Sequence, residues 1–207
     1  MKTPLSFYFS EFALEAGVDE VGRGCLAGSV VAAAVIFPKN YRNTFLNDSK
    51  KLSQKDRKEL DIEIRENAFS FAIAEASPAE IDKINILNAS FLAMQRAIIQ
   101  LNPVPEFLII DGNRFKTELK IPFECIIKGD SKYLSIAAAS ILAKNYRDDF
   151  MIKLAEKYPH YGWETNVGYP TKKHKLGIAE HGLTKYHRKT FNSSLNRRWE
   201  LGFGDGN

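Results

Sequence analysis

Four acidic residues lie where buried segments of the chain end, and carboxylates in such places can bind divalent metal ions. These residues are Asp19, Glu20, Asp111 and Asp130. Asp111 follows the apolar segment 107–110, and Asp130 follows the segment 123–127. If the strands that end near Asp19 and Asp111 are parallel neighbours, their acids emerge at the same edge of a sheet. Because clustered carboxylates repel one another and hard oxygen ligands select Mg²⁺ or Mn²⁺, we expect a divalent metal site there.

Each acid also has a structural explanation when it is taken alone. Asp111-Gly112 and Gly129-Asp130 are turn-forming pairs. Asp19 and Glu20 lie inside an apolar strand, where a buried acidic pair without basic partners is costly, so the functional interpretation is favoured for them. Neighbouring residues of a strand face opposite sides. The two acids therefore reach one metal only if the chain twists after them.

The segment Gly22-Arg23-Gly24 interrupts the strand and permits two interpretations. The glycines can simply form a tight turn. Alternatively, two residues without Cβ let a nucleic-acid backbone or a ribose approach main-chain groups, while Arg23 meets a phosphate. The residue pattern leaves both open.

The hydrophobic pattern predicts a mixed α/β sheet. Expected strands cover residues 14–21, 29–37, 70–76, 107–110 and 123–127. Expected helices cover residues 54–68, a long stretch from Pro78 that ends before Asn102-Pro103, and residues 135–157. The first two strands are close enough in sequence for a hairpin, and the long helix is the crossover between the third and fourth strands.

Length and composition favour one soluble domain. With 207 residues, 44% of them hydrophobic, the chain can bury one core, so we expect a single catalytic domain over 1–207. Its core is expected at about 14–157, a basic substrate-binding region at about 158–200 and a disordered tail at 202–207. The sequence shows neither a secretory signal nor an apolar run of membrane-spanning length. Cys25 and Cys125 lack a CxxC partner, so we expect two reduced, buried thiols and a cytoplasmic location. We also expect a monomer.

Positive charge is concentrated late in the chain. The formal net charge is +4, and the stretch 170–198 holds eight of the 29 Lys and Arg residues but one acid, Glu180. Such asymmetry suits a polyanionic partner, although a solvated basic face without a ligand has the same pattern.

Several motifs, in order and spacing, resemble ribonuclease HII, and the match extends from about residue 14 to about residue 195. They are the stretches 16–24, 48–53, 110–113, 128–132, 135–144 and 158–174. The resemblance implies the ribonuclease H-like fold: a five-stranded mixed sheet flanked by helices, with a helical basic C-terminal region. It also implies Asp19, Glu20, Asp111 and Asp130 as catalytic, metal-binding carboxylates for Mn²⁺ or Mg²⁺.

By the same resemblance, we expect two-metal hydrolysis of the RNA strand of RNA·DNA hybrids, and cleavage on the 5′ side of ribonucleotides embedded in duplex DNA. The expected products carry 3′-hydroxyl and 5′-phosphate ends. The backbone of Gly22, Arg23 and Gly24 would read the 2′-hydroxyl, Tyr169 would pack on the adjoining sugar, and Lys50 would contact the substrate backbone.

This chain departs from the family pattern at two positions. Cys25 stands where proline is more frequent, and Pro170 follows Tyr169 where glycine is more frequent. The departures concern the stiffness of the first turn and the direction of the tyrosine, and they leave the acids unchanged.

Other polar residues are better explained by packing or by surface hydrogen bonds. They are Ser140, Lys144, His160, His174, His181 and His187. Asp148-Asp149 is expected on a solvated helix face.

Two other functions fit parts of this sequence. A non-catalytic nucleic-acid-binding protein explains the basic segment but leaves the buried acids without purpose. Ribonuclease HIII shares the acid chemistry but resembles this chain less, because about 13 residues precede the first strand here, whereas that group usually carries an N-terminal substrate-binding domain.

Overall fold

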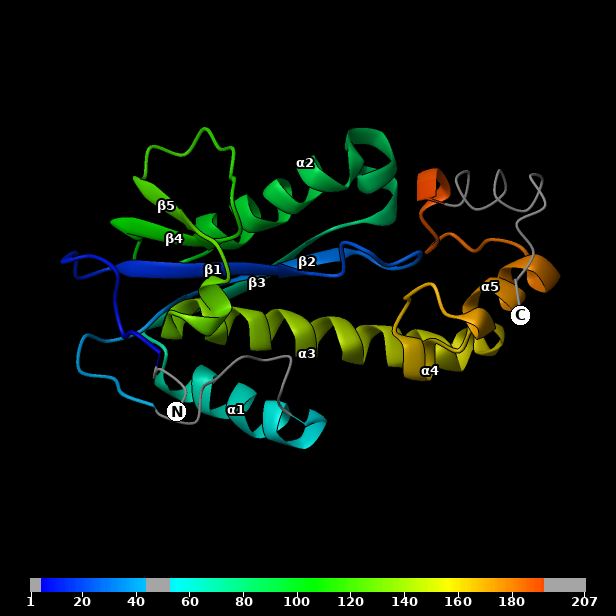
Figure 1. Ribbon diagram of the computed structural model, residues 1–207, viewed down its shortest axis with the longest axis horizontal. Helices are drawn as coiled ribbons and strands as arrows, with labels where there is room; N and C mark the ends of the chain where they lie inside the picture. The colour runs from blue at the N-terminus through cyan, green and yellow to red at the C-terminus, as the bar shows by residue number, and fades with distance from the viewer. Residues whose placement is uncertain (1–4, 44–52, 192–207) are drawn as a thin grey trace.

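The computed structural model describes residues 5–43 and 53–191, which form a five-stranded sheet flanked by helices (Figure 1). The order in the sheet is β3-β2-β1-β4-β5. The strands are β1 (Glu15–Val21), β2 (Val30–Ile36), β3 (Ser70–Ala76), β4 (Phe107–Asp111) and β5 (Phe123–Ile126). The helices are α1 (Gln54–Asn67), α2 (Pro78–Ile99), α3 (Leu134–Lys157), α4 (Trp163–Asn166) and α5 (Lys172–His181), with 3-10 turns η2 (Gly129–Ser131) and η3 (Pro159–Tyr161).

β1 is the central strand of the sheet. It pairs antiparallel with β2, where Val18 lies opposite Ala34, and parallel with β4, where Val18 lies opposite Ile110. β4 pairs parallel with β5, and β2 pairs antiparallel with β3. The predicted hairpin and the predicted mixed sheet are therefore confirmed. The carboxyl ends of β1 and β4 lie at one edge of the sheet.

Helices cover both faces of the sheet, so both sets of alternating side chains are buried. α2 lies on one face, and α3 lies on the other with α1 outside it (Figure 1). Along β2, Ala32 and Ala34 pack in the α2 layer, whereas Ala33 and Val35 pack in the layer of α1 and α3. This double burial explains why β2 is apolar without alternation.

α2 begins as predicted but contains a break that the hydrophobic pattern does not show. Ser77 Oγ accepts a hydrogen bond from Glu80 N, and the Glu80 carboxylate accepts one from Ser77 N, which together form a capping box before Pro78. Asn85 has φ 64° and ψ 165°, and its Oδ1 accepts from Asn88 N and so caps the second segment. The prediction of one uninterrupted helix is wrong at Asn85. Apolar spacing continues through the kink because both segments face the same core.

α3 approaches β1 very closely at Gly17. A Cβ at this position would lie 2.4 Å from the backbone nitrogen of Ile136, so another residue would force the helix away from the strand. This contact brings the first turns of α3 directly under the strand that carries Asp19.

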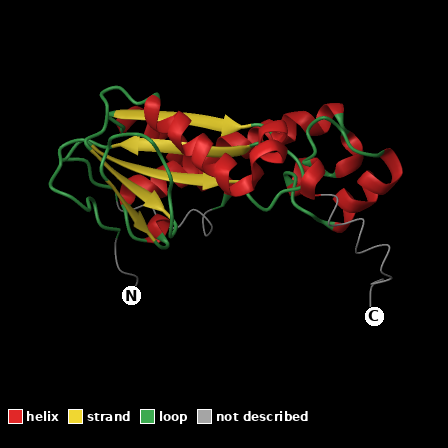
Figure 2. Cartoon of the chain, turned by 90° about the horizontal axis from the view of Figure 1, so that it is seen from above, coloured by secondary structure: helices red, strands yellow, loops and turns green. Residues whose placement is uncertain are grey.

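The C-terminal part of the chain packs beyond the carboxyl end of β1, where Figure 2 shows α4 and α5. Its core includes Tyr161 and Trp163, which stack with ring centroids 4.9 Å apart. Backbone hydrogen bonds join it to the β1–β2 loop: Leu26 N donates to Gly168 O, and Arg188 N donates to Leu26 O. The predicted helical C-terminal region is confirmed within the described residues. The expected tail at 202–207 lies outside them.

The ends of most elements agree with prediction to within one residue, but the burial of the cysteines does not agree fully. Cys25 is buried, whereas Cys125 is only half-buried because it lies on β5, an edge strand. Both are free thiols. None of the described helices combines the length and the apolar character needed to cross a membrane.

Two buried histidines link the C-terminal segments. His187 Nδ1 accepts a hydrogen bond from Thr184 N, and its Nε2 lies 3.2 Å from His174 Nε2, which also accepts from Trp163 Nε1. His174 Nδ1 lies 2.9 Å from Tyr169 O, where it acts as the donor. Both rings are therefore neutral. Their role in packing, which the sequence favoured, is confirmed.

This pair predicts acid sensitivity of the fold. Burial, together with the neighbouring His174, lowers the pKa of His187 from 6.5 to about 4. As the pH falls from 6.5 toward 4, the unfolded chain takes up a proton that the folded chain refuses, so the stability present above pH 6.5 is lost. We expect this residue to cost on the order of 2 kcal/mol between pH 7 and pH 5, measured by urea unfolding. His187→Gln should lose less stability over that interval. Equal losses in both proteins would contradict the assignment.

Candidate active site

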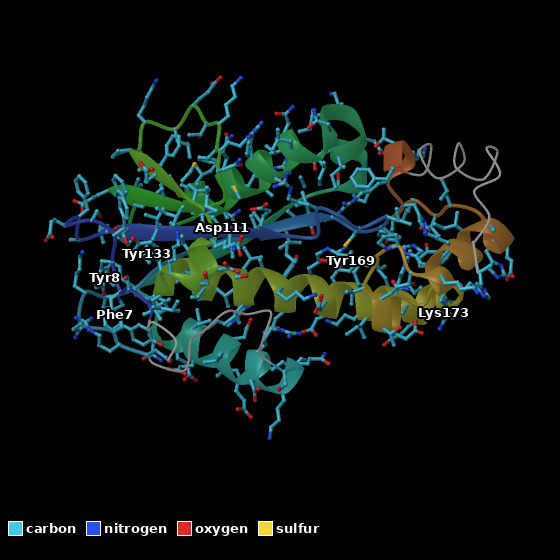
Figure 3. The ribbon with its side chains drawn as sticks, in the orientation of Figure 1. Phe7, Tyr8, Asp111, Tyr133, Tyr169 and Lys173 are labelled. Carbon is cyan, nitrogen blue, oxygen red and sulfur yellow. The ribbon has the colours of Figure 1, made fainter. Side chains whose placement is uncertain are left out.

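Strand pairing brings the predicted acids of β1 and β4 to the same edge of the sheet. Asp19 is 6% exposed, and Asp111 is the last residue of β4 (Figure 3). The expectation that these two strands are parallel neighbours is confirmed.

Asp19 and Glu20 lie on opposite faces of the sheet, as the alternation of a strand requires. Asp19 lies opposite Ala33, in the α3 layer, and it accepts a hydrogen bond from the hydroxyl of Ser140 on α3. Glu20 lies opposite Ala32, in the α2 layer. Asp19 and Glu20 therefore both lie near Asp111 without a twist of β1 that would turn them to the same face.

The carboxylates of Asp19, Glu20 and Asp111 are close enough for their charges to affect one another. Burial, and then the charges of Glu20 and Asp111, raise the pKa of Asp19 well above its ordinary value. Burial also raises the pKa of Glu20, against the lowering effect of Arg23 and with a further contribution from Asp111. A divalent cation would remove the cost of holding these charges together.

Asp111 and Asp130 are joined through the turn that follows β5. Gly129 N donates to Asp111 Oδ1 at 2.6 Å, and Asp130 follows within η2, where it is 4% exposed. Lys128 has φ 56°, which reverses the chain just before this turn. Asp130 is therefore buried directly after the amide that binds Asp111, and its part in the site stays a prediction.

The acidic side chains of the site are not arranged as the complete ligand set of a metal ion. Within residues 5–43 and 53–191, no three His, Cys, Asp or Glu side chains stand in the arrangement of a bound ion. The donor set nevertheless fits Mg²⁺ or Mn²⁺, because it consists of carboxylates whose charged form is disfavoured by their own neighbours.

A pocket of 260 Å³ opens beside the acids, and we call it the carboxylate pocket. Its polar side is formed by Glu20, Arg23, Asp111 and Arg114, and its apolar side comes from α2. Arg23 Nη1 lies 3.1 Å from Glu20 Oε1, which holds the carboxylate beside the opening. The pocket thus presents two arginines, which can bind a phosphate, beside two carboxylates.

The two glycines around Arg23 have different surroundings. Gly22 has φ 92°, and a Cβ there would lie 2.3 Å from Arg147 Nε, so this glycine makes the turn. At Gly24, an added Cβ would meet no atom within 4 Å. The backbone of Gly24 is accessible to a ligand, as the second interpretation requires.

Tyr169 lies beside Cys25, the site of one departure from the family pattern. Burial is the main cause that raises the pKa of both groups, and each group also affects the pKa of the other. Tyr169 remains 39% exposed, and Lys144 Nζ lies 5.9 Å from its ring centroid. Figure 3 shows Tyr169 between Asp111 and the C-terminal helices. The tyrosine is therefore presented to solvent beside the glycine turn.

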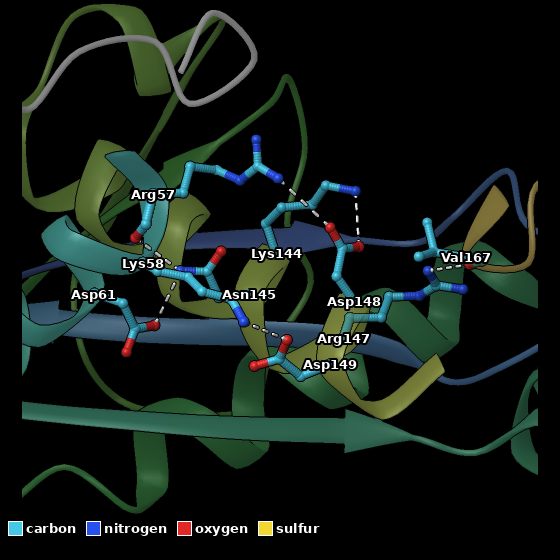
Figure 4. A network of polar contacts seen from close by, with 9 residues as sticks. All are labelled: Arg57, Lys58, Asp61, Lys144, Asn145, Arg147, Asp148, Asp149 and Val167. Carbon is cyan, nitrogen blue, oxygen red and sulfur yellow. Dashed lines mark hydrogen bonds and ion pairs between the residues drawn. The ribbon is translucent and has the colours of Figure 1, made fainter. Parts of the chain in front are cut away.

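Two further predictions have different outcomes. Lys50 and its motif lie outside the described residues. The expectation that Asp148 lies on a solvated face is wrong: it is buried, and it pairs with Lys144 of its own helix and with Arg57 of α1 (Figure 4). α1 packs against this side of α3, which a helical pattern alone cannot reveal. Asp149 is more exposed and pairs with Lys58.

Several residues shape the site although the sequence pattern gives them no role in it; for Ser140 the pattern favours packing or a surface hydrogen bond. Ser140 bonds Asp19, Arg114 lines the carboxylate pocket, and Arg147 and Arg188 lie fully buried beneath the glycine turn. For Arg147 a signal exists, because it stands in a helix whose neighbouring turns are apolar. Arg188 carries no comparable signal among the surrounding basic residues.

Comparison with known proteins agrees with this arrangement. A family model described as Ribonuclease HII matches residues 16–194. A protein named Ribonuclease HII from Bacteroides thetaiotaomicron is 60% identical over 185 residues, which cover 89% of this chain and 92% of that protein. The ribonuclease H2 of Pyrococcus horikoshii has a similar fold, with a TM-score of 0.74 and 23% identity over 92% of this chain and 99% of that one. The RNase HII of Archaeoglobus fulgidus, solved in complex with PCNA, has a TM-score of 0.71 and 28% identity over 85% of this chain and 94% of that one.

The repulsion at Asp19 predicts that removal of its charge stabilises the metal-free protein and weakens metal binding. Asp19→Asn keeps the acceptor for Ser140 but removes one charge, so the variant should melt at a higher temperature than the wild type in EDTA. Addition of Mn²⁺ should stabilise the wild type by about 3 kcal/mol at a hundredfold excess over its dissociation constant, and the variant by much less. Thermal melts with and without Mn²⁺ measure both effects. A variant that is less stable in EDTA, with an undiminished response to Mn²⁺, would refute this account.

Proposed function

Because this chain belongs to the ribonuclease HII family, and is thus a type 2 ribonuclease H that cuts the RNA strand of RNA·DNA hybrids, we propose that it also cleaves duplex DNA on the 5′ side of embedded ribonucleotides. Family membership decides against a non-catalytic binding protein. The identity of 60% to a relative named Ribonuclease HII also favours this type over ribonuclease HIII.

The observation that carries the proposal is that the pairing of β1 with β4 brings Asp19, Glu20 and Asp111 to one edge of the sheet, where their charges repel one another and where Glu20 and Asp111 line the carboxylate pocket. We assign these three residues and Asp130 to the binding of two divalent ions, Mn²⁺ or Mg²⁺. When bound, such ions supply the positive charge that stabilises the entering and leaving oxygens of phosphodiester hydrolysis. The products then carry 3′-hydroxyl and 5′-phosphate ends.

The protein itself fixes the directions of these carboxylates. Gly129 N holds one oxygen of Asp111, the Ser140 hydroxyl holds Asp19, and Arg23 holds Glu20. Such anchored ligands lose little freedom when a cation and a phosphate arrive, and this preorganisation favours reaction.

The turn beside the acids is suited to distinguish RNA from DNA. The open backbone at Gly24 allows a sugar to approach, and Arg23 can meet a phosphate, so we assign Gly22, Arg23 and Gly24 to the 2′-hydroxyl. Tyr169 presents part of its ring beside this turn and would pack on the adjoining sugar.

The basic region is proposed to hold the duplex by its phosphates, with one revision. Lys172, Lys185 and Lys189 are exposed, but Arg188 is fully buried, so it cannot contribute to that surface. Arg197 and Arg198 lie outside the described residues. We propose that the protein binds as a monomer, and the two free thiols are in keeping with a cytoplasmic site of action.

A three-substrate assay tests the function. The wild type should cleave a single-ribonucleotide duplex and an all-RNA hybrid but not plain DNA, each in Mg²⁺ and in Mn²⁺. Asp111→Asn should lower kcat on both cleaved substrates at least about a hundredfold, because a missing metal carboxylate removes several kcal/mol of charge stabilisation.

Asp149→Asn makes the same chemical change at a partly exposed acid that pairs with Lys58, away from the carboxylate pocket. It is the matched control and should retain wild-type cleavage. Wild-type rates in Asp111→Asn at saturating metal would disprove the carboxylate assignment. Failure of the wild type on the single-ribonucleotide duplex would disprove the proposed substrate.

Lys50 is proposed to contact a backbone phosphate, which gives a separate expectation. Lys50→Ala should weaken binding of ribonucleotide-containing and plain duplexes alike. It should also reduce the slope of log affinity against log salt by about one. Fluorescence anisotropy over a range of salt concentrations measures this slope. An unchanged slope would exclude the contact.

A further inference from the structure

The Gly22-Arg23-Gly24 turn rests on the guanidinium of Arg188. Arg188 Nη2 donates to Gly22 O at 2.6 Å, Nη1 donates to Arg23 O at 2.8 Å, and Nε donates to Gly28 O at 3.0 Å. The residue is 0% exposed. A side chain from near residue 190 therefore binds three backbone carbonyls of one loop near residue 25.

The turn depends on this side chain for its shape. The hydrogen bond of the turn itself, from Cys25 N to Gly22 O, is 3.5 Å long, whereas the bond from Arg188 to the same oxygen is 2.6 Å. Burial lowers the pKa of Arg188 to about 10, so the group is still charged at neutral pH and its hydrogen bonds are charge-assisted. A planar guanidinium can serve two adjacent carbonyls at fixed angles, and a lysine ammonium cannot.

Arg147 supports the same loop at other points. It donates to Ser29 O and Ala27 O in the loop, and to Val167 O in the segment that leads to Tyr169 (Figure 4). The carbonyls of the recognition turn itself, at Gly22 and Arg23, are held by Arg188.

The direction of a carbonyl fixes the direction of the next amide. In a planar trans peptide, the C=O of one residue and the N–H of the following residue point in opposite directions. Because Arg188 draws the carbonyls of Gly22 and Arg23 inward, the N–H groups of Arg23 and Gly24 point outward. The space above Gly24 is open, so these donors face the solution.

We propose that Arg188 is a positioning residue for ribonucleotide recognition, which, on the proposed function, directs the N–H groups of Arg23 and Gly24 toward the sugar of the substrate. It acts through the turn and touches neither the substrate nor the four acids. Its contribution is to specificity for ribose and not to the general attraction of a duplex.

The test compares two affinities of the same enzyme in Mn²⁺. KM is measured for a single-ribonucleotide duplex, and Ki is measured for the matched all-DNA duplex as a competitor. Their ratio, Ki/KM, reports the preference for ribose and does not depend on the fraction of active enzyme. Arg188→Lys should lower Ki/KM about tenfold through a higher KM, because charged hydrogen bonds to the turn are lost, and it should leave Ki unchanged.

Two controls separate positioning from stability. Arg96→Lys makes the same chemical change at an arginine that donates to Glu75 O, in contact with α2 and β3 instead of the turn. Ile64→Ala opens a cavity in the buried cluster of α1 and α3 and lowers the melting temperature. Both should keep the wild-type Ki/KM ratio.

Arg188→Gln gives a second route if the lysine variant does not fold. An unchanged Ki/KM in either folded variant would overturn the proposal, and so would loss of the fold in both, since Arg188 would then serve the fold alone. A wild type that fails to cleave the single-ribonucleotide duplex would instead refute the proposed function, which the experiment detects before any variant is compared.

Discussion

The parallel pairing of β1 with β4 brings the negative charges of Asp19 and Asp111 together. The other contacts of the site hold these carboxylates in place against their repulsion. Asp19 and Asp111 lie at the same edge of the sheet because their strands run side by side in the same direction. Burial, and then their repulsion together with that of Glu20, raises the pKa of carboxylates that a stable core would normally avoid. The fold therefore holds in place an arrangement whose repulsion a divalent cation would relieve, and this repulsion lowers local stability in the absence of such an ion.

The C-terminal region belongs to the site as much as the sheet does. It supplies Tyr169 beside the glycine turn, and two buried arginines bind the loop between β1 and β2 from below. His174 in turn fixes the backbone of Tyr169. The acids and the glycine turn are thus supported from opposite sides. α3 and the sheet hold the acids, and the segment around residue 188 holds the glycine turn.

The sheet and the identity of the acids could be predicted from the sequence, but the supporting contacts could not. Short apolar runs that end in an acid indicate strands, and the spacing of the motifs placed the acids in a family. In the sequence, Arg188 cannot be told apart from the other basic residues of 170–198. Its acceptors are backbone carbonyls of a loop far away in the chain, and the sequence does not indicate which carbonyls accept a side-chain hydrogen bond. Asp148 was misassigned for the same reason, since its partner Arg57 lies on another helix. Asn85 interrupts α2 without disturbing the apolar spacing.

The dependence of the β1–β2 loop on Arg188 also sets an order of events during protein synthesis. The strands and all four acids are translated by residue 130, well before the guanidinium that shapes the loop leaves the ribosome. A nascent chain can therefore carry all four acidic residues before the side chain that binds the carbonyls of Gly22 and Arg23 has been made. The loop between β1 and β2 therefore cannot take its final shape until residue 188 has been added to the chain.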